Sequence, residues 1–325
     1  MVKQNNKYSF LLLLFYLLSA VFAVVGTVFS GFELLFMSVL CTSCYAVSVF
    51  CSNSKGALVP PILSVILVAA IKFDFVNIIS CLIIFVPSGL CAGILMKKQA
   101  GFKKTVIYTA LVSVLSLISV LVMKSYAEYQ IVSVESVLKP FKNTIEQLKN
   151  VFIEQYGSEN GLYNDYADTI EEMYSILYDT FASLFVGIVS SFALIAGFIS
   201  YMAAGKIMSI IDPSQRVESI RAFRMKKLDA VVFIVAFLFS RVFENTAAVA
   251  MSNLAAVLQL PFLLSGFCVF EYWMDKKGFT AKKKTLLIIA ICFTVFFPLF
   301  DILTIMSFIG VFDTFYLFRD RRKVE

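Results

Sequence analysis

Long apolar stretches alternate with shorter polar connections along almost the whole chain of 325 residues. Ten such stretches can be distinguished, at about 9–29, 32–50, 57–71, 75–96, 105–123, 181–205, 229–243, 248–273, 285–299 and 302–318. Several are close to the ~20 residues that an α-helix needs to cross a bilayer. A β-barrel would instead show ~10-residue segments of alternating hydrophobicity. The pattern predicts an all-α, polytopic helical membrane protein with about ten transmembrane helices.

One polar region, residues 124–180, is much longer than the others. Apolar residues recur in it at the spacing of amphipathic helices, first at Val134, Leu138, Phe141, Ile145, Leu148 and Phe152, then at Tyr163, Tyr166, Ile170, Met173 and Leu177. We therefore predict a helical hairpin with its turn at 157–161. Pro140 suits the first turn of a helix, so the first helix is expected to begin near Lys139. The second is expected to continue unbroken into the sixth apolar stretch.

Two interpretations of the hairpin stay open. Its apolar stripes either pack on each other or on the membrane surface, or they form a lid or a docking site for an external partner. The predicted organisation is a five-span N-terminal bundle over 1–123, the hairpin over 124–180, and a five-span C-terminal bundle over 181–325.

Composition narrows the possible chemistry. Hydrophobic residues make up 60% of the chain, charged residues 15%, and the mean hydropathy is +0.86, which is unlike a soluble domain. The chain contains no histidine, which removes Ser-His-Asp triads and metal sites that need imidazole. All seven cysteines lie in or beside apolar stretches, so Cys41 and Cys44 are interpreted as packing residues despite their CxxC spacing. We expect no cofactor and no metal.

The distribution of basic residues predicts the orientation. With ten spans and a cytoplasmic N-terminus, the 28 Lys and Arg residues divide 22 to 6 in favour of the cytoplasmic side, as the positive-inside rule requires. Both termini are therefore expected in the cytoplasm, with residues 124–180 outside the plasma membrane. Orientation and contact with anionic lipid account for the net charge of +6, so a nucleic-acid partner is not expected.

Ionisable residues at membrane depth are candidates for a functional site, because burying a charge in lipid is costly. The candidates are Asp313, Glu271, Asp301 and Arg319. Asp313 should face the protein and contact a polar group from another segment. Arg319 is six residues away, off the spacing that aligns side chains on a helix. The expected donor is therefore a backbone N–H, a hydroxyl or a basic side chain from another span or inner loop, with Arg221 and Arg224 as candidates. Asp313 is either a structural pin or a titrating, solute-coordinating carboxylate.

Small residues are also arranged at regular spacing within the apolar stretches. Gly89 and Gly93 form a GxxxG pair just after Pro87. Such pairs let helix backbones approach closely, so we interpret them as a helix-packing seam.

The last third of the chain carries sequence patterns that resemble a known family. "DPSQRVESIRAFRMKKLDAVVF", "NLAAVLQLPFLLSGFCVFEYWMDKKG" and "GVFDTFYLFR" occur in this order, and together they resemble the YybS-like bacterial multi-pass membrane proteins, a domain of unknown function. That resemblance implies a last helix ending in Gly-x-x-Asp followed by Arg, here Gly310, Asp313 and Arg319. The N-terminal part is similar in architecture to the substrate-binding components of energy-coupling-factor transporters.

These observations favour small-solute binding or transport, with a non-catalytic membrane scaffold or assembly partner as the alternative. The partners expected are the lipid bilayer, a small-molecule solute and another membrane protein. No enzyme activity is expected, because the chain has no GxxxxGK[ST], HExxH or GxSxG motif. Transport requires a cavity with convergent polar groups, whereas a scaffold requires a packed bundle and an exposed contact surface.

Overall fold

The fold is helical throughout the residues that the computed structural model describes, which are 6–28, 32–52, 55–71, 74–157, 162–211, 223–280, 283 and 302–319. No strand occurs among them, so the all-α prediction is confirmed. Five of the helices are long and apolar enough to cross a membrane, and the shorter segments 12–26, 56–71 and 302–316 are apolar as well. The expected ninth span, 285–299, lies outside the described residues.

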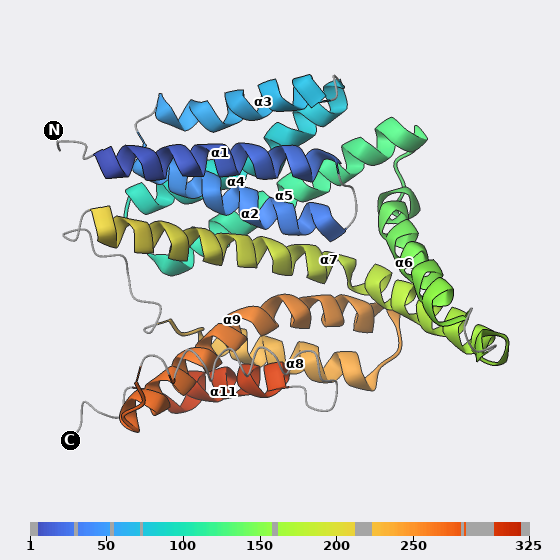
Figure 1. The fold of residues 1–325 in the computed structure, drawn as a ribbon. Helices are drawn as coiled ribbons and strands as arrows, with labels where there is room; N and C mark the ends of the chain where they lie inside the picture. Colours follow the sequence, from blue (N-terminus) through green and yellow to red (C-terminus); the bar gives the residue numbers. More distant parts are fainter. Residues whose placement is uncertain are drawn as a thin grey trace. The chain divides into compact units, whose positions relative to one another are not determined.

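The chain divides into two compact units, Met1–Val217 and Glu218–Glu325 (Figure 1). Unit 1 contains α1 (Asn6–Val28), α2 (Phe32–Cys51), η1 (Gly56–Leu58), α3 (Val59–Ile71), α4 (Phe75–Lys97), α5 (Phe102–Tyr129), α6 (Val134–Gly157) and α7 (Leu162–Ile211). Unit 2 contains α8 (Lys227–Val242), α9 (Thr246–Lys276) and α11 (Ile302–Tyr316). The predicted division placed the sixth span in the C-terminal bundle, whereas this span belongs to α7, which packs on α2 and α5 of unit 1.

Helix α2 lies at the centre of unit 1, in contact with α1, α4 and α7. Its Tyr45 packs edge-on against Phe85 of α4, with ring centroids 5.0 Å apart, and the Tyr45 hydroxyl donates to the Ala57 carbonyl oxygen at 2.8 Å. Because Tyr45 and Phe85 are almost fully buried, this aromatic pair contributes to the apolar core of the unit.

The glycine pair of α4 lies on this same contact with α2. A Cβ atom added at Gly89 would come within 2.5 Å of the Tyr45 ring, and one added at Gly93 within 2.6 Å of Val49. Helix α4 continues through Pro87 without a break. The two glycines therefore allow close packing between α2 and α4, consistent with their interpretation as a packing seam.

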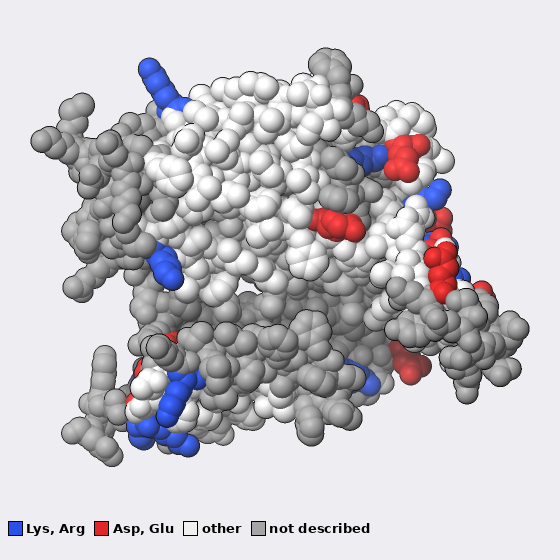
Figure 2. Space-filling view, in the orientation of Figure 1, with Lys and Arg blue, Asp and Glu red and all other residues white. Residues whose placement is uncertain are grey.

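The two ends of unit 1 differ in charge. The turn between α4 and α5, with Lys97, Lys98, Lys103 and Lys104, lies at the same end as the N-terminus and the end of α7. We call this the basic end. The opposite end carries α6 and the first part of α7, and we call it the hairpin end (Figure 1). A broad surface without charged side chains separates the two ends in Figure 2, as expected for a surface in contact with lipid.

The hairpin begins earlier than Pro140 suggests. Helix α6 starts at Val134, and Pro140 lies inside it, so the expected start near Lys139 is wrong. Two serines explain the early start: the Ser136 N–H donates to Ser133 Oγ at 3.0 Å, and the Ser133 N–H donates to Ser136 Oγ at 2.9 Å. This reciprocal pair satisfies two N–H groups at the helix start, as a capping box does, so the helix forms ahead of its proline.

Helix α7 confirms that the hairpin continues into the membrane. It is a single helix of 50 residues, about 75 Å long at ~1.5 Å per residue, which is more than twice the ~30 Å of the hydrocarbon core. Its first part therefore extends beyond the membrane and pairs with α6 in antiparallel fashion, as the 3.8 Å ion pair between Lys149 and Glu171 indicates.

The apolar stripe of α6 is buried only at three of its positions. Leu138, Phe141 and Ile145 are 4%, 0% and 4% exposed. The Phe141 ring lies 5.0 Å from that of Phe181 on α7 and 5.2 Å from that of Phe32 at the start of α2. Further along α6, Leu148, Val151 and Phe152 are exposed, and so are Met173, Ile176 and Leu177 on α7. The two stripes were expected to face each other along the hairpin. In the described residues, the buried part of α6 packs instead on the part of α7 nearest the membrane.

Unit 2 is organised around a close crossing of α9 and α11. Gly266 and Gly310 lie at this crossing: a Cβ added at Gly266 would collide with the Met306 carbonyl oxygen, and one added at Gly310 with that of Phe262. Both obstacles are backbone atoms of the neighbouring helix. The two helices run in the same direction, because Gln259 contacts Thr304 and Ser307 near the start of α11 while residues further along α9 meet its end.

Candidate functional site

A buried ionic cluster surrounds Asp313 near the end of α11. The Asp313 side chain is 0% exposed, and its Oδ2 accepts from Arg319 Nε at 2.9 Å, Arg319 Nη2 at 2.6 Å and Arg224 Nε at 3.0 Å. Arg319 Nη2 also donates to the Phe223 carbonyl oxygen at 2.7 Å and to Ser265 Oγ at 3.4 Å. The cluster therefore connects α11, α9 and the residues that precede α8.

The contact of Asp313 with a basic side chain from another segment agrees with the sequence prediction, and Arg224 is that side chain. The expectation that Arg319 is a poor partner is wrong. Helix α11 ends at Tyr316, and Leu317 adopts a left-handed conformation with φ of 54°. Because the chain leaves the helix at this point, Arg319 folds back over the helix end, and the spacing rule for a continuous helix no longer applies.

The other predicted candidates lie elsewhere in the chain. Glu271 lies half-buried on α9. Asp301 and Arg221 lie outside the described residues. Gly89 and Gly93 belong to the α2–α4 contact of unit 1.

The geometry of the cluster suits a structural pin. Asp313 Oδ2 receives all three donors, and Oδ1 has no hydrogen-bond partner within the described part of the chain. Arg319 and Arg224 are only 9% and 20% exposed. Removing one member of a buried ion pair typically costs ~3–5 kcal/mol, because its partner remains buried and uncompensated. The cluster thus fixes the end of α11 against α9 and the start of α8.

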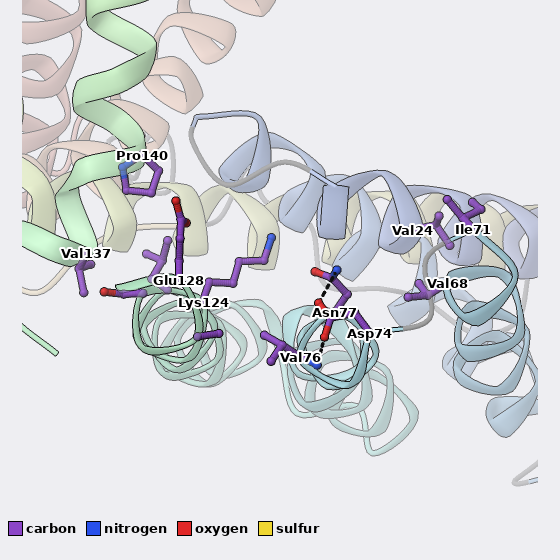
Figure 3. Close-up of a pocket in the computed structure, with 13 residues that line it drawn as sticks. Val24, Val68, Ile71, Asp74, Val76, Asn77, Lys124, Glu128, Val137 and Pro140 are labelled. Atoms are coloured by element: carbon purple, nitrogen blue, oxygen red, sulfur yellow. Dashed lines mark hydrogen bonds between the residues drawn. The ribbon is translucent and has the colours of Figure 1, made fainter. Parts of the chain in front are cut away.

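A cavity of about 540 Å³ opens at the hairpin end of unit 1 (Figure 3). Its walls come from the ends of α1, α3 and α5 and from the starts of α4 and α6. The apolar part of its lining comprises Val24, Val68, Ile71, Val76, Leu121, Ala127, Val137 and Pro140, and its polar part comprises Asp74, Asn77, Lys124, Ser125 and Glu128. This volume and this mixture of apolar walls with a few polar groups are typical of small-molecule sites.

Charges of both signs face this cavity. Asp74 is the N-cap of α4: one of its carboxylate oxygens accepts from the Val76 N–H at 3.1 Å and the other from Asn77 Nδ2 at 2.9 Å. In Figure 3 the Lys124 side chain extends toward the side of the cavity that carries Asp74 and Asn77, whereas Glu128 points toward Pro140. A ligand in the cavity would therefore meet a carboxylate, an ammonium group and a second carboxylate in turn.

The sequence analysis missed this cavity. The sequence does not single out Asp74 or Lys124 as site residues, because each lies next to an expected membrane boundary, where charged side chains are common. One signal in the sequence could have pointed to the cavity. Polar residues occur at the ends of several spans that are predicted to lie on the same side of the membrane. Sequence spacing alone did not show that these span ends converge.

The described residues offer no metal centre. No group of three or more Cys, Asp or Glu residues that could hold a metal ion occurs among them. The six described cysteines are free thiols, and the Cys41 thiol donates to the Ser19 carbonyl oxygen at 3.1 Å. Cys292 lies outside the described residues.

Comparison with known proteins places the chain in a family. A family model described as Predicted membrane protein (DUF2232) matches residues 10–314. A search of curated proteins and a search of solved structures each found no match.

Proposed function

We propose, on the premise that the chain belongs to this family of predicted membrane proteins, that it binds a small solute in the cavity of unit 1 as the first step of transport. The observation that supports this proposal is the cavity itself, with its 540 Å³ volume, apolar walls and convergent polar side chains. A tightly packed scaffold has no need of such a space. The proposal assigns no catalytic step to the protein.

The direction of access follows from the proposed orientation. The basic end of unit 1 carries four lysines in the turn between α4 and α5, and basic residues favour the cytoplasmic side of a bacterial plasma membrane. The hairpin end then faces outward, so the cavity is open to solutes outside the cell. This position differs from a site at the membrane midplane.

Cysteine labelling tests the orientation. Gln147 on α6 and Lys98 at the basic end are both exposed, and each is replaced by cysteine in a protein whose seven native cysteines have been removed. A membrane-impermeant maleimide applied to intact cells should label position 147 and should label position 98 only after lysis. Labelling of position 98 in intact cells would reverse the proposed orientation.

A solute library tests the binding proposal. Purified protein is heated in detergent with sugars, nucleosides, amino acids, dipeptides and vitamins, and a binder present at 100 times its Kd should stabilise it by about 2.7 kcal/mol. Ala127 lines the cavity from an exposed position on α5, so Ala127→Trp should fill the cavity and abolish the stabilisation. Tyr126→Trp, at an exposed neighbour outside the lining, is the matched control.

The scaffold alternative is favoured by the exposed apolar residues on the outer half of the hairpin, among them Leu148 and Leu177. If no solute stabilises the protein, and a membrane protein partner is lost from purified complexes on Leu148→Ser and Leu177→Ser substitution, the alternative replaces solute binding.

A further inference from the structure

The charged groups of the cavity are arranged in a way that restricts the class of solute. Asp74 and Glu128 contribute carboxylates, and Lys124 contributes an ammonium group between them (Figure 3). Each Asp74 oxygen accepts one hydrogen bond, whereas a carboxylate has about four acceptor positions, so Asp74 retains capacity for donors from a ligand. The amide of Asn77 beside it has a second N–H and a carbonyl oxygen.

An uncharged solute would displace water from the carboxylates of Asp74 and Glu128 without supplying a charged donor in its place, which is unfavourable. A solute with a single charge would pair with the side chains of opposite charge and would be repelled by those of its own charge. A zwitterion satisfies both signs, because its ammonium group and its carboxylate can each form a charge-assisted hydrogen bond. The apolar wall of Val24, Val68 and Leu121 provides room for an apolar side chain on the same molecule.

We propose that the solute is a zwitterion of the amino-acid or dipeptide class, with its ammonium group at Asp74 and Asn77, its carboxylate at Lys124 and its apolar part against the α1–α3–α5 wall. This inference rests on the proposed function and specifies the ligand of the same cavity. The 540 Å³ volume lies within the ~300–1,000 Å³ typical of small-ligand sites, which accommodates molecules of this size.

The test is a titration of the purified full chain by calorimetry with the twenty common amino acids and with glycyl dipeptides of each. The tightest binder is then compared with the amine that lacks its carboxylate and the acid that lacks its amino group. Each truncated compound should bind at least ~10-fold more weakly, because each loses a hydrogen bond between charged groups.

Two substitutions assign the charges to their positions. Asp74→Asn should leave the helix cap intact, because Asn caps helices as well as Asp, yet it should weaken binding of the zwitterion by ~10-fold or more. The deaminated acid should bind the Asp74→Asn variant at least as tightly as the parent, because a repelling carboxylate has been removed. Lys124→Gln should weaken binding of the zwitterion similarly, while the decarboxylated amine should bind that variant at least as tightly as the parent. Gln147→Glu is the control, because residue 147 is exposed on α6 and lies away from the lining. It should change the affinity neither for the zwitterion nor for the truncated compounds.

The outcomes separate the two levels of the proposal. If a sugar, nucleoside or singly charged compound binds, is blocked by Ala127→Trp, and outcompetes every amino acid and dipeptide, the zwitterion class is overturned while solute binding in the cavity stands. If no compound of any class binds, both proposals fail.

Discussion

The Asp313 cluster of unit 2 and the cavity of unit 1 combine the same kinds of charged group with opposite consequences. Asp313 is fully buried, and two arginines direct three hydrogen bonds to one of its oxygens. Asp74 and Lys124 are half-buried, and both line an open cavity with the exposed Glu128. A buried cluster fixes one geometry, whereas charges that still reach water can exchange it for a ligand. This difference supports a stabilising role for the Asp313 cluster and is consistent with the solute binding that we propose for the cavity.

The largest expected effect is that of Asp313→Ala. The substitution leaves Arg224 and Arg319 buried without their carboxylate, so the free energy of unfolding should fall by ~3–5 kcal/mol. Thermal unfolding in detergent and the yield of monodisperse protein measure the loss. Glu244→Ala, at an exposed acid after α8, is the control and should change little. Parent-like stability of Asp313→Ala would remove the distinction between the two sites.

The second-largest loss of stability is expected for Gly310→Ala. The new Cβ would meet the Phe262 carbonyl oxygen of α9, which is backbone and cannot rotate away, so the helices must separate at a cost of ~1–3 kcal/mol or more. Gly89→Ala in unit 1 meets side-chain atoms of the buried Tyr45 instead of backbone. Relief there requires the Tyr45 ring to repack but not the helix backbones to separate, so this variant should cost less. Thermal unfolding ranks the two variants. Equal losses would show that the α9–α11 crossing is no more constrained than the α2–α4 seam.

The hairpin provides a comparison within a single helix. Ile145→Asp buries a carboxylate at a position 4% exposed, whereas Leu148→Asp places one at a position 55% exposed on the same helix. Ile145→Asp should destabilise the packing of α6 on α7 by ~1–3 kcal/mol. Leu148→Asp should have little effect on it. Limited proteolysis from the outer side should cut Ile145→Asp faster than both Leu148→Asp and the parent. Identical cleavage of both variants would show that α6 has no buried positions.

The smallest expected effect on stability is that of Asp74→Asn, at ~0.5 kcal/mol or less, because asparagine retains the N-cap of α4. A thermal unfolding curve that overlaps the parent would separate this carboxylate from the structural role of Asp313. A loss as large as that of Asp313→Ala would make Asp74 a structural residue and weaken the case for a ligand.

The sequence by itself determined the fold class and much of the hairpin. Apolar stretches of membrane-spanning length admit only helices there, because backbone groups in lipid must be satisfied within the segment. The stripe through Leu138, Phe141 and Ile145 predicted an amphipathic helix, and the unbroken pattern after 162 predicted the continuity of α7. The buried, helix-joining position of Asp313 also followed, since an acid at that depth needs a donor.

Tertiary structure alone decided which residues meet. Arg319 reaches Asp313 because Leu317 turns the chain out of the helix, an event that helical spacing does not anticipate. The first helix of the hairpin begins at Val134 because two serines cap each other, which outweighs the preference of Pro140 for a first turn. The cavity forms because the ends of five helices converge. Periodicity specifies the faces of one helix, whereas the convergence of several helix ends depends on contacts between residues far apart in the chain.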